Sequence, residues 1–185
     1  MSGDDASVAP RVVAGVSGSL GSVTALYRAA AEARRRGAEL WPVVAWEPPG
    51  GDLAVRRFPA SCLVPEEWQR VATERLLSAL DDVFGAVGPD VPLCALVVRG
   101  SPGHVLVETA SREDDLLVVG TGRRGWHRAF SGWVSRYCLA HAVCPVLAVP
   151  PSPLESDLTA VHRRIAWHRR MDPRQVLKGD KGFPA

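Results

Sequence analysis

The stretch VVGTGRRGWHRAFSGWVS, residues 118–135, changes character along its length. It begins as an apolar run typical of a buried strand, becomes rich in glycine and arginine, and then leads into a helical segment. Glycine lets the backbone come close to a ligand, and the first turn of a helix presents free N–H groups that favour an anion. The stretch therefore predicts a strand–loop–helix unit of an α/β fold, with a candidate phosphate-binding loop.

The rest of the chain repeats this alternation of strand and helix. Helical periodicity runs from Ser22 to Gly37, from Pro65 to Gly85, and over 101–111 and 133–142. Short apolar or β-branched runs typical of covered strands lie at 11–17, 38–48, 92–100, 114–121 and 144–150. This β-α-β-α-β-α-β-α-β order predicts a single doubly wound, Rossmann-like α/β domain with a five-stranded parallel sheet.

Some local expectations follow from the same pattern. On the first helix, Val23, Leu26, Tyr27, Ala30 and Ala33 are spaced to form the buried stripe. Ser101 is in a good position to cap the third helix, with Pro102 after it. We expect the pair Asp114 and Asp115, which precedes the fourth strand, to form a solvated turn at the end of the sheet away from any ligand.

Composition and charge narrow the function classes. The 185 residues suffice for one domain, and a net charge of +2 is too small to indicate nucleic acid or an acidic membrane. No apolar run approaches the roughly 20 residues that span a bilayer, and the start MSGDDASVAP is no signal peptide. The four cysteines form no CxxC pair, which predicts reduced, mostly buried thiols and a cytoplasmic protein.

We expect the degree of structural order to vary along the chain. We expect residues 1–10 to be disordered and residues 11–150 to form the domain. The long Gly/Pro-containing connection at 48–64 is typical of a lid, a binding loop or a mobile insertion. The extension at 151–185 contains ESDLTAVHRRIAWHRRM, which predicts a tail helix followed by disorder. This helix is either a solvated or packed tail or a basic helix that binds an unidentified protein partner.

Glycines concentrate after the first and fourth predicted strands, in VSGSLGS and GTGRRG. In open α/β sheets, ligands bind beyond the carboxyl ends of the strands, where the strand order reverses. Arg123, Arg124 and Arg128 would add donors for a phosphate. The residues alone leave two interpretations open, since every βα connection needs some glycine. The region is either an anion or nucleotide crevice or a set of plain connections with solvated arginines.

Three long stretches resemble the universal stress protein family. They are residues 11–46 (RVVAGVSGSLGSVTALYRAAAEARRRGAELWPVVAW), 97–125 (VVRGSPGHVLVETASREDDLLVVGTGRRG) and 134–150 (VSRYCLAHAVCPVLAVP). The resemblance implies the strand order 3-2-1-4-5 and a homodimer, commonly formed through the last strand. It also implies a non-enzymatic role in stress response or dormancy, through nucleotide sensing or a partner protein.

One branch of this family binds ATP through Gly, two residues, Gly, nine residues, and Gly followed by Ser or Thr. Here one residue separates Gly120 from Gly122, whereas nine residues separate Gly122 from Gly132, as in the family. Trp133 takes the place of the hydroxyl residue. The loss of one hydroxyl hydrogen bond to phosphate costs roughly 1.5–3 kcal/mol, and an indole inside the phosphate space would cost more.

The adenosine side of the site also departs from the family. Ser17 ends the first strand where the family often has an Asp that meets the adenosine, and Ala45 falls about where a backbone contact to adenine is expected. The resemblance implies ATP, possibly with Mg²⁺, or another adenine nucleotide as the ligand. The candidate site consists of Val16, Ser17, Gly18, Ala45, Gly120, Gly122, Arg123, Gly132, Trp133, Val134 and Ser135.

Two alternatives remain open. A family member that has lost the nucleotide would act by dimerisation and protein partners. The segment GVSGSLGS also resembles the pyrophosphate loop of ATP-dependent adenylating enzymes, but Ser19 replaces its second Gly and Gly21 stands where its Asp belongs. The histidines have no Cys, Asp or Glu at ligand spacing, so we predict no metal site. The resemblance, together with the lack of a general base in the loop, predicts a protein that is not an enzyme.

Overall fold

The computed structural model describes residues 9–48, 65–121, 132–150 and 152. The chain divides into two units, Met1–Pro151 and Ser152–Ala185, and the sheet belongs to the first. Within the described residues, five parallel strands form one sheet in the order β3-β2-β1-β4-β5, as predicted. The strands are β1 (Arg11–Gly15), β2 (Glu39–Trp46), β3 (Leu96–Arg99), β4 (Leu116–Gly120) and β5 (Val146–Val149).

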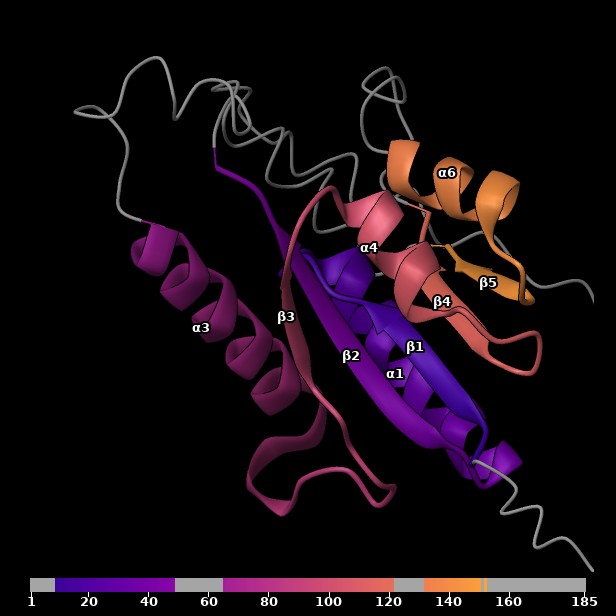
Figure 1. The fold of residues 1–185 in the computed structure, drawn as a ribbon. Coiled ribbons are helices and arrows are strands. Elements are labelled where there is room, and N and C mark those ends of the chain that lie inside the picture. Colours follow the sequence, from indigo (N-terminus) through magenta and orange to yellow (C-terminus); the bar gives the residue numbers. More distant parts are fainter. Residues whose placement is uncertain (1–8, 49–64, 122–131, 151, 153–185) are drawn as a thin grey trace, which may run out of the picture. The chain divides into compact units, whose positions relative to one another are not determined.

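Helices cover both faces of this sheet (Figure 1). They are α1 (Leu20–Arg36), α3 (Pro65–Phe84), α4 (Pro102–Thr109) and α6 (Trp133–His141), and a 3₁₀ turn, η1 (Gly85–Val87), follows α3. Figure 1 shows α4 and α6 side by side on one face, with α1 behind the strands on the other. None of the helices within the described ranges is long and apolar enough to cross a membrane.

Alternate residues of the central strands supply two separate cores. Val12 and Ala14 face α1 and α3, whereas Val13 faces α4 and α6, because successive strand residues point to opposite faces. On the first face, Ala29 and Leu76 are fully or almost fully buried. The strands are therefore apolar without alternation, which is why they read as continuous hydrophobic runs in the sequence.

The boundaries of α1 agree with the sequence, but part of its buried stripe does not. Ser19 caps the helix by accepting a hydrogen bond from the Ser22 amide, and Gly37 ends it in the left-handed conformation with φ of 60°. Tyr27, predicted to be buried, is 62% exposed. The buried face of α1 consists instead of Ser22, Ala25, Leu26, Ala29, Ala30 and Ala33, and Tyr27 lies outside that face.

The predicted cap of α4 is also incomplete. Ser101 occupies the N-cap position, but its side chain makes no capping hydrogen bond. Pro102 at the first position of the helix is favourable, because its ring fixes φ and its missing N–H would have had no partner within the helix.

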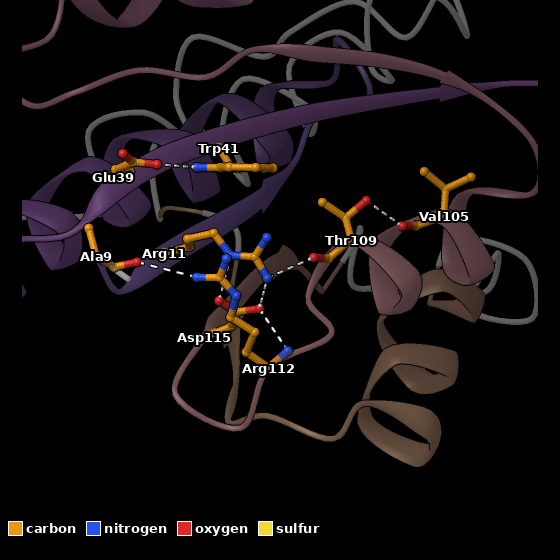
Figure 2. Close-up of polar contacts among 8 residues, drawn as sticks. All are labelled: Ala9, Arg11, Glu39, Trp41, Val105, Thr109, Arg112 and Asp115. Carbon is orange, nitrogen blue, oxygen red and sulfur yellow. Dashed lines mark hydrogen bonds and ion pairs between the residues drawn. The ribbon is translucent and has the colours of Figure 1, made fainter. Parts of the chain in front are cut away.

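The expectation of a solvated turn at Asp114 and Asp115 was wrong for Asp115. Its carboxylate is fully buried and accepts hydrogen bonds from Arg11 at 2.8 and 2.5 Å, and one from the Arg112 amide at 3.0 Å (Figure 2). The Arg11 guanidinium also lies 4.8 Å from the centre of the Trp41 ring. The Asp115 carboxylate raises the pKa of Arg11. This buried ion pair joins the amino-terminal ends of β1 and β4.

Two cysteines behave as core residues, as expected. Cys138 is fully buried between α6 and the sheet, and Cys144 is also buried. Burial raises the pKa of the Cys138 thiol to about 11 and also raises that of Cys144. Because the thiolate is the reactive form, both thiols are poor nucleophiles at neutral pH.

Candidate functional site

A cavity of about 270 Å³ lies where the strand order reverses, at the carboxyl ends of β1 and β4. Residues from β1, β2, β4, α1, α3, α4 and α6 border it. The residues that line the cavity are Gly15, Val16, Ser17, Ser19, Gly21, Ser22, Val43, Ala45, Arg75, Pro102, Leu106, Val119, Gly120 and Val134. This is the place at which open parallel sheets bind ligands.

The end of β1 forms the floor of the cavity and then turns away. Val16 extends the pairing with β2, since its amide donates to the Val43 carbonyl at 2.9 Å. Ser17 then leaves the sheet and remains exposed, with its hydroxyl 2.9 Å from that of Ser19. Gly18 has a φ of 75°, a conformation that favours glycine, and this turn directs the chain into α1.

The end of β4 touches the first turn of α1. A Cβ atom on Gly120 would lie 2.9 Å from the carbonyl oxygen of Gly21 and 3.2 Å from its carbon. Only glycine fits this close approach of two backbones without a shift of one of them. The two glycines therefore bring the polar backbone of α1 to the edge of the cavity.

Three helices begin at the cavity. The first turn of α1 lines it through Gly21 and Ser22, that of α4 through Pro102, and that of α6 through Val134. None of these three first turns contains an acidic residue, whereas α3, which begins elsewhere, has Glu66 and Glu67 in its first turn. Helix N-termini carry partial positive charge, and acidic residues near them are stabilising. The three helix N-termini that meet at the cavity have no acidic residue in their first turns. Their partial positive charges therefore remain available to an anionic ligand.

The structure brings five of the residues predicted for the site to the cavity. Those five are Val16, Ser17, Ala45, Gly120 and Val134. They come from three neighbouring strand ends and from the start of α6, which the sequence order separates widely.

Four other predicted residues that the structure describes do not line the cavity. Gly18 contacts its wall, and Gly132 is the N-cap of α6. Ser135 is buried, and its hydroxyl donates to the Gly132 carbonyl at 3.2 Å. Trp133 is 46% exposed, and its ring centre lies 5.5 Å from that of Tyr137.

The predictions that concern the glycine- and arginine-rich loop lie outside the described residues. Gly122 and Arg123 belong to this group. So do the connection at 49–64 and the tail helix expected in the extension at 151–185.

Sequence reasoning missed several residues that line the cavity. Ser19 and Gly21 could have been predicted, because they belong to the glycine-rich turn after the first strand. Leu106 and Arg75 carry no such signal, since each is one residue of an ordinary amphipathic helix. Only the packing of α3 and α4 on the two faces of the sheet brings them to the site.

The lining has little capacity for acid–base or metal chemistry. Among the described residues that border the cavity there is no Asp, Glu, His or Cys. The described part of the chain also holds no cluster of three or more such residues that could bind a metal ion. The described lining offers backbone amides, hydroxyl groups and one guanidinium, which can donate hydrogen bonds to an anion.

These features define a doubly wound α/β protein with an anion-suited cavity at its topological switch point. Residues 9–150 match the sequence model of the Universal stress protein family, and the chain belongs to this family. It is 32% identical over 150 residues to a universal stress protein of Mycobacterium tuberculosis. That match covers 77% of this chain but only 45% of the relative, so the chain spans about half the length of this relative.

Two solved structures of universal stress proteins have a fold similar to that of this chain. A universal stress protein in complex with cAMP is 28% identical, with a TM-score of 0.50, over 79% of this chain and all of that one. The universal stress protein from Archaeoglobus fulgidus in complex with dAMP is 23% identical, with a TM-score of 0.55, over 77% of this chain and 98% of that one.

Proposed function

We propose that this chain binds an adenine nucleotide, ATP or a related one, and acts without catalysis as a stress-response or dormancy factor. The observation that carries the proposal is the cavity at the switch point, where three helix N-termini without acidic first-turn residues meet. The universal stress protein described in complex with cAMP supports an adenine nucleotide as the ligand. Ser17 and Ala45, at two strand ends, would hold the adenosine.

The phosphates would be held by the backbone near Gly21, Gly120 and the start of α6. No carboxylate of the described residues borders the cavity, so Mg²⁺ would arrive bound to the phosphates of ATP. The same lining offers no general base for hydrolysis. We therefore propose binding without rapid turnover, and a turnover near 1 s⁻¹ or faster would contradict it in favour of an enzyme, such as one that adenylates a substrate.

Trp133 decides between this proposal and its main alternative, a family member without a nucleotide. The residue stands where the ATP-binding branch has a hydroxyl, but its side chain is not part of the cavity lining and rests beside Tyr137. An indole outside the cavity leaves space for a phosphate. The cost of the missing hydroxyl is then one hydrogen bond rather than a blocked site.

Calorimetric titration of the nucleotide-stripped protein tests this. We expect the wild type to bind ATP in the micromolar range, and Trp133→Ser to bind about tenfold more tightly, because the serine restores a donor to phosphate. Leu139→Ser, at another exposed apolar position of α6, is the matched control and should leave the affinity unchanged. No binding by the wild type, with binding restored in Trp133→Ser, would mean that the indole blocks the site. No binding by either protein would favour action through partners alone.

We also propose that the chain forms a cytoplasmic homodimer through β5. Among the described strands, β5 pairs with β4 and ends the sheet, and an edge strand presents N–H and C=O groups that can pair with another strand (Figure 1). The exposed apolar residue Val143 lies nearby in sequence. Light scattering on the purified chain should give twice the mass of one chain at micromolar concentration. A single-chain mass at that concentration would contradict the homodimer.

A further inference from the structure

One wall of the cavity is formed by Arg75, which comes from the middle of α3. The stem of this side chain passes directly over Gly18. A Cβ atom on Gly18 would lie 2.7 Å from Cγ of Arg75, 2.9 Å from its Cδ and 3.5 Å from its Nε. The arginine can therefore occupy its place only because residue 18 has no side chain.

Arg75 is also the only charged residue among the described residues that line the cavity. Its side chain makes no hydrogen bond or ion pair with any residue that the structure describes. Arg70, on the same helix, differs in this respect, because Glu67 and Glu74 hold it at 2.9 and 2.6 Å. The charge of Arg75 is thus left available to whatever enters the cavity.

We propose that Arg75 makes this cavity prefer a phosphorylated nucleoside over the neutral nucleoside. The inference rests on the proposed function, since it assigns a specificity-determining residue to the same nucleotide site. The guanidinium adds a full positive charge to the partial charges of the three helix N-termini, and no carboxylate of the described lining offsets it. A guanidinium also matches phosphate geometry better than an ammonium group does.

This role of Arg75 agrees with the residues at the end of β1, where the sequence departs from the family pattern. Ser17 brings no charge, so no described residue of that wall pairs with Arg75 or repels an anion. Gly18 follows at once and provides both the turn and the space for the arginine stem. The two positions together favour an anionic ligand on the side of the cavity that faces α3.

The test compares the affinities of AMP and adenosine for the full-length, nucleotide-stripped protein by calorimetry. We expect the wild type to bind AMP at least tenfold more tightly than adenosine, because charge-assisted hydrogen bonds to phosphate are strong. In Arg75→Gln the affinity for AMP should fall about tenfold while that for adenosine changes less than about twofold. Arg75→Lys should keep part of the preference, and added salt should weaken it in the wild type.

Arg70→Gln is the matched control, because it removes another exposed arginine of the same helix, one that lies outside the lining. It should bind both ligands as the wild type does. The inference about Arg75 is overturned if Arg75→Gln keeps the preference for AMP, or loses AMP and adenosine equally. A wild type that binds neither AMP nor adenosine overturns the inference about Arg75, and it overturns the proposed function only if ATP does not bind either, which separates the two failures.

Discussion

Asp115→Asn is expected to lower the free energy of unfolding by about 3–5 kcal/mol, because it leaves the buried guanidinium of Arg11 without its counter-charge. Both side chains are at most 9% exposed, and two hydrogen bonds join them. Water can therefore replace little of what the carboxylate provides. The pair also links β1 to the turn before β4, so its loss weakens the central pairing of the sheet.

Urea denaturation followed by circular dichroism measures this effect. Asp114→Asn is the control, because the neighbouring carboxylate is exposed, and it should change stability by less than about 0.5 kcal/mol. Replacing both partners, in Arg11→Met with Asp115→Leu, should recover part of the loss, since no unpaired charge then remains buried. Equal stability of Asp115→Asn and Asp114→Asn would show that the pair contributes nothing.

Gly120→Ala is expected to reduce nucleotide affinity about tenfold or more and to lower stability by about 1–3 kcal/mol. The added methyl group would lie 2.9 Å from the Gly21 carbonyl oxygen, which is backbone and has no flexible end to move away. The start of α1 must therefore shift from the end of β4, and both segments line the cavity. Loss of binding and loss of stability have the same cause here.

Gly132→Ala is the control for Gly120→Ala. It distinguishes the clash with the Gly21 backbone from the mere replacement of a glycine. Among the described residues, a Cβ atom at Gly132 would come no closer than 3.9 Å to its nearest neighbour, the Thr121 carbonyl oxygen, and the φ of −107° suits any residue. Its affinity and melting temperature should stay close to those of the wild type. If both variants bind nucleotide equally well, the contact between β4 and α1 does not shape the site.

The fold followed from the sequence because its signals are local and repeated. Each strand is buried on both faces and reads as a short apolar run, and Gly37 marks the end of α1 by its own backbone geometry. The alternation of these elements leaves few topologies for a parallel sheet. The strand order itself came from the family resemblance, and the structure confirms it.

The parts that sequence reasoning missed depend on contacts between distant residues. Asp115 looks like half of a polar pair, and nothing local shows that Arg11, 104 positions away, will bury it. Tyr27 lies beside Leu26 in the sequence pattern, but the packing of α1 on the sheet sets the buried face at Ala25, Leu26 and Ala29 and leaves Tyr27 exposed. Arg75 reaches the cavity because α3 packs beside Gly18, and no sequence motif indicates this contact.

Amide chemical-shift mapping during an AMP titration tests the central claim most directly, because it reports both binding and its location. We expect saturable shifts at the strand ends and at the start of α1, with Ser17, Gly21, Ala45 and Gly120 among the largest. The amides around the Arg11–Asp115 pair, at the opposite ends of the strands, should stay unchanged. No saturable shift at millimolar AMP, or shifts confined to residues away from the cavity, would contradict a nucleotide site at the switch point.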